Sequence, residues 1–92
     1  MTVNLQRVEL IRERLTHALA PQDLDIADVS DEHAGHAGAQ SGKGHFNVVI
    51  VAAAFSGKTP IERHRMVYEA LGDAMHTDIH ALSIRAYAPD EL

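Results

Sequence analysis

One stretch, HFNVVIVAAAF (residues 45–55), decides the fold of this chain. It is an almost unbroken apolar run, rich in β-branched side chains at its middle, as a buried strand requires. A helix start follows it at Thr59, Pro60 and Glu62. Threonine is a good N-cap, proline suits the first helical position, and glutamate three residues after the cap completes a capping box. Residues 79–87 predict a second strand, so this part of the chain reads strand, helix, strand.

The helix between these strands is predicted over residues 60–76. Its apolar side chains recur at helical spacing and are expected to pack on the sheet. This stripe consists of Ile61, His64, Tyr68, Leu71 and Met75, widened by Val67 and Ala74. In the last strand, alternation places His80 on one face with Leu82, Ile84 and Ala86, and places Ser83 and Arg85 on the other.

The flanking segments complete the domain. Residues 4–19 predict an amphipathic packing helix. Residues 24–30 alternate and then slip in parity at Val29, which indicates an edge strand or a bulge. Residues 31–44 contain four glycines and no bulky apolar side chain, so we expect a flexible surface loop. Residues 88–92 are expected to form a frayed acidic tail.

The order of these elements fixes the topology. A helical crossover of this length implies two parallel strands with a right-handed connection. The first strand reaches the second through a loop and can pair with it antiparallel. We therefore expect a single α+β domain over residues 1–92, in the order α-β-β-α-β, with a three-stranded mixed sheet and helices packed on it.

The composition narrows the function classes. A formal net charge of -5 argues against a chain that coats nucleic acid or an anionic membrane through overall charge. The absence of cysteine excludes disulfides and thiolate ligands from this chain. No apolar stretch is long enough to span a bilayer and no secretory signal is visible, so a cytoplasmic protein is the expectation. Gly57-Lys58-Thr59 resembles the end of a phosphate-binding loop, but residue 52, where that motif needs glycine, is alanine; we expect no enzyme.

Seven histidines in a chain of 92 residues are the most suggestive feature of the composition. Parallel strands start at the same rim of a sheet, and the first strand ends at that rim. The topology therefore directs five histidines towards one rim: His33, His36, His45, His76 and His80. Imidazole is a common ligand for transition metals and the leading ligand type in a chain without thiols.

These histidines also have structural interpretations, and His76 is most simply a surface residue at a helix end. His80 could be a partly buried, hydrogen-bonded strand residue, and the pair His33 and His36 could be solvated loop side chains. His45 could hold the loop to the strand start. His64 lies on the apolar helix stripe, at the opposite rim, and is most simply a packing residue.

Four sequence blocks resemble the BolA family closely in order and spacing, within residues 31–89. They are His45-Phe46-x-Val48, Phe55-x-Gly57, Arg63-His64-Arg65-Met66-Val67-Tyr68-x-x-Leu71 and Ile79-His80-Ala81-Leu82-Ser83-Ile84. The resemblance implies a class II KH-like fold, with an extra helical turn near residues 57–61.

The resemblance also implies a partner and a cofactor. Members of this family bind monothiol glutaredoxins as heterodimers and share a [2Fe-2S] cluster with them, held on the partner's side by a glutaredoxin cysteine and a glutathione thiol. The histidine of the last-strand block, His80 here, would be one ligand. The second would come from the loop, where an ungapped count reaches Ala34, flanked by His33 and His36; the choice between these two stays open. Alone, the chain is expected to be a monomer.

The alternative function is that of a DNA-binding transcriptional regulator. Some members of the family resemble such regulators. The basic patch would comprise Lys58, Arg63, His64 and Arg65, near a helix start that can itself meet phosphate. The competing structural interpretation of Arg63 and Arg65 is a solvated helix face paired with Glu62 and Glu69.

Overall fold

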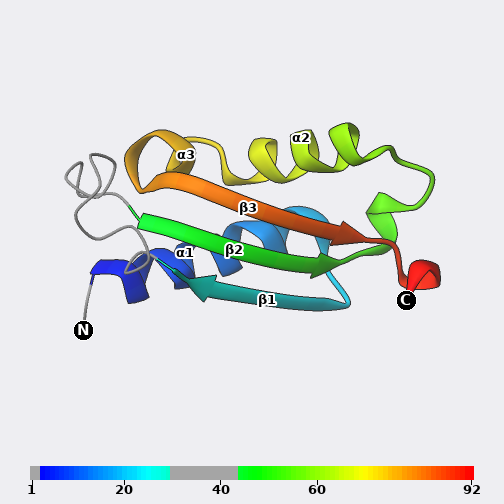
Figure 1. Cartoon of the computed structure of the whole chain (residues 1–92), viewed down its shortest axis with the longest axis horizontal. Coiled ribbons are helices and arrows are strands. Elements are labelled where there is room, and N and C mark those ends of the chain that lie inside the picture. Colours follow the sequence, from blue (N-terminus) through cyan, green and yellow to red (C-terminus); the bar gives the residue numbers. More distant parts are fainter. Residues whose placement is uncertain (1–2, 30–43) are drawn as a thin grey trace.

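The computed structural model describes residues 3–29 and 44–92, with the side chains of residues 3 and 4 left out. Three strands form one mixed sheet in the order β1-β2-β3, and the two long helices α1 and α2 pack on it (Figure 1). None of the described helices is long and apolar enough to cross a membrane.

The elements follow the predicted order. Helix α1 covers Val3–Leu19, strand β1 Asp23–Asp28 and strand β2 Gly44–Val51; a 3₁₀ turn η3 at Ala53–Phe55 precedes α2 at Pro60–Leu71, the short α3 at Ala74–Thr77, β3 at Ile79–Tyr87 and a 3₁₀ turn η4 at Pro89–Glu91. Strand β1 pairs antiparallel with β2, and β2 pairs parallel with β3. The predicted α+β architecture and the direction of each strand pairing are confirmed.

The core lies on one face of the sheet. Alternate residues of β2, namely Phe46, Val48 and Ile50, are at most 1% exposed and meet side chains from both helices. Helix α1 contributes Ile11 and Leu15, and α2 contributes Val67 and Leu71. The other face of β2 carries exposed Asn47 and Val49, so the helices cover one side of the sheet and leave the other open.

Two predicted elements end earlier than expected. The strand predicted to reach Phe55 ends at Val51, because Phe55 turns into the core from η3 and is fully buried. This turn lies a few residues before the position that the resemblance implied. The helix predicted to reach residue 76 stops at Leu71, because Gly72 adopts a positive φ of 54°, and α3 begins after it. Glycine takes this conformation without the steric cost that a Cβ brings.

The predicted packing stripe of α2 is partly wrong. Val67, Leu71 and Ala74 are buried as expected, but Ile61 is 71% exposed and Tyr68 is 42% exposed. Helix α2 contacts α1 and the edge strand β3, and the flank that carries Ile61 and Tyr68 is exposed.

The acidic tail is also more ordered than predicted. Ala88 is 1% exposed, and Pro89–Glu91 form η4 instead of a frayed end. The Ala88 amide donates to the Glu91 carboxylate at 2.7 Å, which closes this turn.

The one-sided core makes a direct prediction about β2. Phe46→Ala should lower the free energy of unfolding by about 3–5 kcal/mol, because it removes a fully buried ring and leaves a cavity. Val49→Ala, on the open face of the same strand, should cost less than about 1 kcal/mol. Urea unfolding followed by circular dichroism measures both, and similar losses for the two variants would contradict a core on one face only.

Candidate functional site: the histidine rim and the start of helix α2

Strands β2 and β3 begin side by side, as the topology predicted. Gly44 lies opposite Ile79, and the Gly44 amide donates to the Asp78 carbonyl at 3.0 Å. His45 then lies opposite Ala81, one residue beyond His80. His45 and His80 are therefore close neighbours on adjacent strands. We call this edge of the sheet, where β2 and β3 start, the histidine rim.

A β-bulge decides how His80 is presented. One step along β2, from Gly44 to His45, corresponds to two steps along β3, from Ile79 to Ala81, so His80 is the extra residue. Such a bulge re-aims the side chain that it contains. The His80 side chain is exposed, and the structure gives its ring no hydrogen bond to a described residue. The strict alternation that predicted His80 on the face of Leu82 and Ile84 is interrupted at this residue, and His80 is exposed where partial burial was the structural alternative.

The cause of the bulge was present in the sequence. Ile79 is 3% exposed and belongs to the core, as does the partly buried Leu82. These residues are three apart, and strict alternation would send them to opposite faces. One extra residue allows both to face the core, and that residue is a histidine.

The rim is supported by an ion pair from α1, which sequence reasoning missed. Arg7 Nε contacts Asp78 Oδ1 at 3.3 Å, and the Arg7 side chain is only 12% exposed. The Thr77 hydroxyl donates to the other Asp78 oxygen at 2.8 Å. These contacts hold the residue before β3 against the start of α1, and they fix the backbone that carries His80.

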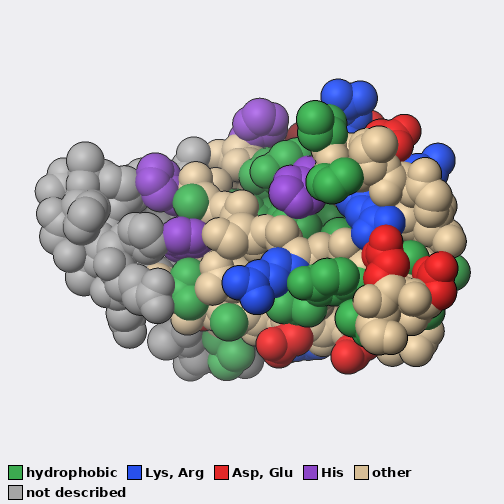
Figure 2. Space-filling view, turned by 45° about the vertical axis from the view of Figure 1, so that its right-hand side comes forward, with side chains coloured by type: hydrophobic (Ala, Val, Ile, Leu, Met, Phe, Trp, Pro, Cys, Tyr) green, Lys and Arg blue, Asp and Glu red, His purple; other side chains and the backbone are tan. Residues whose placement is uncertain are grey.

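The remaining histidines divide into two groups. His76, in α3 just before β3, is exposed near the same rim, so three of the five expected histidines are placed there. Figure 2 shows histidine side chains near this end of the described surface. His33 and His36 lie outside the described residues. Within residues 3–29 and 44–92, no three potential ligands converge as a metal group.

This geometry suits a metal site to which the chain contributes only some of the ligands. The bulge offers an exposed imidazole with no hydrogen-bond partner among the described residues, which is what a ligand awaiting a metal needs. A chain without cysteine supplies no thiolate of its own. Any soft metal centre bound here would need further ligands from elsewhere.

The start of α2 is the second candidate site, and its local structure is as predicted. Thr59 Oγ accepts from the Glu62 amide at 3.1 Å, and the Glu62 carboxylate accepts from the Thr59 amide at 2.8 Å. Pro60 occupies the first turn. The hydrogen bonds to Thr59 lower the pKa of Glu62, so the capping box holds its carboxylate in the charged form.

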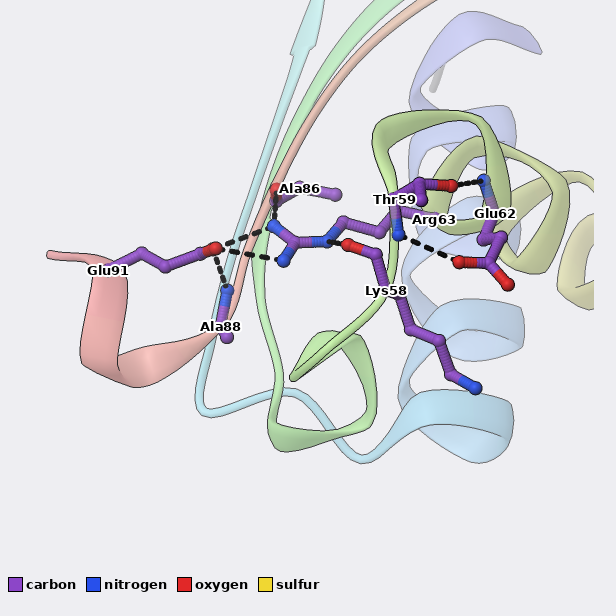
Figure 3. A network of polar contacts seen from close by, with 7 residues as sticks. All are labelled: Lys58, Thr59, Glu62, Arg63, Ala86, Ala88 and Glu91. Atoms are coloured by element: carbon purple, nitrogen blue, oxygen red, sulfur yellow. Dashed lines mark hydrogen bonds and ion pairs between the residues drawn. The ribbon is translucent and has the colours of Figure 1, made fainter.

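Arg63 is fully engaged in a structural network (Figure 3). Its guanidinium donates to Glu91 through two bonds, Nη1 to Oε1 at 2.6 Å and Nη2 to Oε2 at 2.8 Å. It also donates to the carbonyls of Lys58 at 2.9 Å and Ala86 at 3.0 Å. The bonds to Arg63 and to the Ala88 amide lower the pKa of Glu91 to about 2, and the hydrogen bond with Glu91 raises the pKa of Arg63.

This network corrects the expectation for Arg63. Its predicted partners were Glu62 and Glu69, but its carboxylate partner is Glu91, 28 residues away in sequence. The side chain is 11% exposed, so it offers little surface to a nucleic acid. Glu91 was missed, although Ala88-Pro89-x-Glu91 carries the proline and glutamate that often begin a helical turn.

The other basic residues of this region differ from Arg63. Lys58 and Arg65 are exposed and line a hollow of about 190 Å³ together with Glu62 and Glu69. His64 is half-buried. The four residues proposed for DNA contact therefore do not form one uniform basic patch.

Comparisons with known proteins agree with the sequence blocks. The family model described as BolA-like protein matches residues 15–91. The SufE-like protein 1 (chloroplastic/mitochondrial) of Arabidopsis thaliana is 45% identical over 87 residues, which cover 89% of this chain and 24% of that protein. The DNA-binding transcriptional regulator BolA of Escherichia coli (strain K12) is 39% identical over 83 residues, covering 90% of this chain and 76% of that protein.

Solved structures agree as well. The BolA domain of SufE1 from Arabidopsis thaliana superposes with a TM-score of 0.83 at 44% identity, covering 94% of this chain and 95% of that one. The chain spans about a quarter of the SufE-like protein and about half of the plant and mammalian BolA1 proteins that it matches. The names of these relatives describe a DNA-binding regulator and BolA-like or SufE-like proteins.

The ion pair between Arg63 and Glu91 predicts an acid-dependent stability. The carboxylate has a pKa of about 2 in the fold, below its ordinary value of 4.5. The pair therefore stabilises the fold fully above pH 4.5, and this contribution disappears as the pH falls towards 2. Glu91→Gln should lower the melting temperature at pH 7, and the difference from the unaltered protein should shrink between pH 4.5 and 2.

Thermal unfolding by circular dichroism across this pH range measures the effect. Glu69→Gln is the matched control, since it removes an exposed carboxylate of α2 that the structure shows in no hydrogen bond or ion pair with a described residue. A difference between Glu91→Gln and the unaltered protein that stayed constant down to pH 2 would contradict the assignment.

Proposed function

Because the chain belongs to the BolA-like family, we propose that it is the histidine-bearing partner of a monothiol glutaredoxin and shares a [2Fe-2S] cluster with it. The proposed role is iron–sulfur trafficking or iron and redox regulation by a cytoplasmic protein that is not an enzyme. The chain would be a monomer when alone and would form a heterodimer with the glutaredoxin.

The observation that carries the proposal is the presentation of His80. The bulge interrupts the alternation of β3 at this residue, the imidazole is exposed, and no described side chain or backbone group forms a hydrogen bond with its ring. A buried structural histidine is expected to have its ring nitrogens satisfied, so the exposed ring favours the ligand interpretation. The backbone before it is held by the hydrogen bond from the Gly44 amide to the Asp78 carbonyl and by the ion pair of Asp78 with Arg7, which would fix the direction of approach.

The donor set fits a shared cluster better than a resident one. His80 and one of His33 and His36 would hold one side, while the glutaredoxin cysteine and a glutathione thiol would hold the other. Ligation by both histidine and thiolate raises the reduction potential of a [2Fe-2S] cluster relative to thiolates alone. Only neutral imidazole can bind, so acid should weaken the complex.

The proposal predicts the effect of removing His80. Mixing the protein with a cluster-loaded monothiol glutaredoxin should change the visible circular dichroism of the cluster, and His80→Ala should abolish that change. His76→Ala is the matched control, because His76 is also exposed near the rim but lies on α3, outside the strand. An unchanged spectrum with His80→Ala would show that the assigned ligand is wrong.

The same titration distinguishes the two loop candidates. Either His33→Ala or His36→Ala should reproduce the loss seen with His80→Ala, and the other variant should behave like the unaltered protein. The variants are compared by far-ultraviolet circular dichroism, so that loss of the cluster signal is separated from loss of the fold.

A second candidate function is sequence-specific DNA binding. It is favoured by the relative from Escherichia coli that is named a DNA-binding regulator, and by the exposure of Lys58 and Arg65 near the start of α2. The N-terminus of a helix also attracts phosphate. The guanidinium of Arg63 is already bonded to Lys58 and Glu91. In DNA binding, Arg63 would therefore hold η4 and the start of α2 in position and would not contact DNA itself.

DNA binding makes its own prediction. The double variant Lys58→Ala with Arg65→Ala should weaken duplex binding and reduce the slope of log affinity against log salt by about 2, one unit for each lost phosphate contact. Arg12→Ala, an exposed arginine on α1, should leave both unchanged. Gel retardation across a salt series measures the slope, and equally weak retardation of every duplex sequence at physiological salt would count against a regulator.

A further inference from the structure

The outer edge of β3 carries backbone groups that no strand satisfies. Strand β3 is at the end of the sheet, and only β2 pairs with it. The Tyr87 carbonyl accepts from the Ala52 amide at 3.0 Å, so the backbone groups of Tyr87 point towards β2. Backbone groups alternate in direction along a strand, so those of Leu82, Ile84 and Ala86 point outward.

These outward groups are only partly used. The Ala86 carbonyl accepts from Arg63 at 3.0 Å. By the same alternation, the amides and carbonyls of Leu82 and Ile84 point away from β2, and outside the strand ladders the structure gives them no hydrogen bond to a described residue. Leu82 and Ile84 are two residues apart and together offer two amide donors and two carbonyl acceptors, at the spacing that a neighbouring strand requires. We call these four groups the β3 edge.

The apolar layer above the β3 edge is incomplete. On the core face, Phe46, Val48 and Ile50 of β2 are at most 1% exposed, whereas Leu82 and Ile84 of β3 are only partly buried. The apolar side chains of the core face are therefore less covered at β3 than at β2.

Helix α2 supplies a second apolar surface there. Ala70 lines a hollow together with Arg14 and His17 of α1, so this side of α2 faces α1. Tyr68 lies roughly 160° around the helix from Ala70. It therefore lies on the side of α2 that faces away from α1, towards the outer edge of β3. Ile61 and His64 lie on the same side as Tyr68, and these three residues are the α2 flank. Figure 2 shows hydrophobic side chains around a histidine in this part of the surface.

We propose that the β3 edge and the α2 flank together bind an extended segment of a partner protein, which adds a fourth strand to the sheet. Strand addition to an open edge takes its affinity from main-chain hydrogen bonds and its specificity from alternate side chains. One set of side chains would lie under Tyr68 and His64 and complete the core layer, so this set is apolar.

Arg85 determines the chemistry of the other set. It lies on the open face of β3, is exposed, and has no ion pair with a described residue. An added strand places its open-face side chains beside those of β3, where opposite charges attract. The partner segment therefore alternates apolar and acidic residues.

Both ends of the site are defined by features already described. Arg63 occupies the Ala86 carbonyl and limits the added strand at one end. The bulge at His80 breaks the regular ladder at the other end. The segment thus has room for about four to six residues in contact, which is a common strand length.

The opposite edge of the sheet is built differently. Strand β1 carries three aspartates in six residues, Asp23, Asp25 and Asp28, all of them exposed. Charged side chains on an edge strand discourage pairing with another chain. Strand β3 carries a single exposed charged side chain, Arg85, against three on the shorter β1, and this contrast favours β3 as the edge that accepts a strand.

The test uses the full chain, labelled with ¹⁵N, and an acetylated octapeptide of alternating valine and glutamate. Binding should slow hydrogen exchange at the amides of Leu82 and Ile84 more than at those of β1. A peptide of alternating valine and lysine should bind about two- to fivefold more weakly, because its charges meet Arg85.

Two peptides with N-methyl groups test the backbone bonds directly. Methylation of alternate amides removes the donors on one edge of the peptide strand only. One of the two alternating patterns should abolish binding and the other should leave it largely intact. Equal effects of both patterns would overturn strand addition, because side-chain docking has no such alternation.

Variants of the protein test the two surfaces. Arg85→Glu should reverse the preference from the glutamate to the lysine peptide, while Arg12→Glu, the same charge change on exposed α1, should not. Tyr68→Ala should weaken both peptides without unfolding the protein, since its side chain is exposed. No protection at Leu82 and Ile84 with any peptide, or the same protection produced by an oligonucleotide alone, would overturn the proposal.

Discussion

The parallel pairing of β2 with β3 is the constraint on which both candidate sites depend. It places two strand starts at one rim and makes α2 return across the covered face of the sheet (Figure 1). His80 gains its position from this pairing, because the parallel register leaves one surplus residue in β3 once Ile79 and Leu82 both face the core. The same pairing satisfies β3 on one side only, which leaves its outer backbone groups available. The core requirement and the exposed histidine therefore have one origin.

The network around Arg63 keeps the other end of the molecule together. One guanidinium joins the segment before α2, the end of β3 and η4 through four hydrogen bonds. Bidentate pairing with a carboxylate is among the stronger polar contacts, and it fixes geometry as well as charge. A basic side chain that looked available for phosphate is thus engaged in holding the C-terminal turn. The exposed cations Lys58 and Arg65 remain at this end, while the histidine rim lies at the other.

The single-sided sheet relates these regions to each other. The helices cover one face of the sheet, and three exposed aspartates lie along β1. The β3 edge lies between the bulge at His80 and the Ala86 carbonyl, which accepts from Arg63. A partner bound along β3 would approach the histidine rim from one end of this edge. The proposed metal ligand and the proposed strand-binding surface are consequently neighbours, although different chemistry supports each of them.

The sequence by itself determined the order of elements, the direction of the strands, the capping box at Thr59 and the residues 79–87 of β3, because these depend on local periodicity and on short-range hydrogen bonds. It could not determine which flank of α2 is covered, since Ile61 and Tyr68 fit the helical period as well as Val67 does, and only the position of α1 distinguishes them. Nor could it pair Arg63 with Glu91, because 28 residues separate two groups that meet only when β3 has folded beside α2. His80 shows the division most clearly: its residue type was evident from the sequence, but its exposure depends on a bulge that the packing of Ile79 and Leu82 imposes.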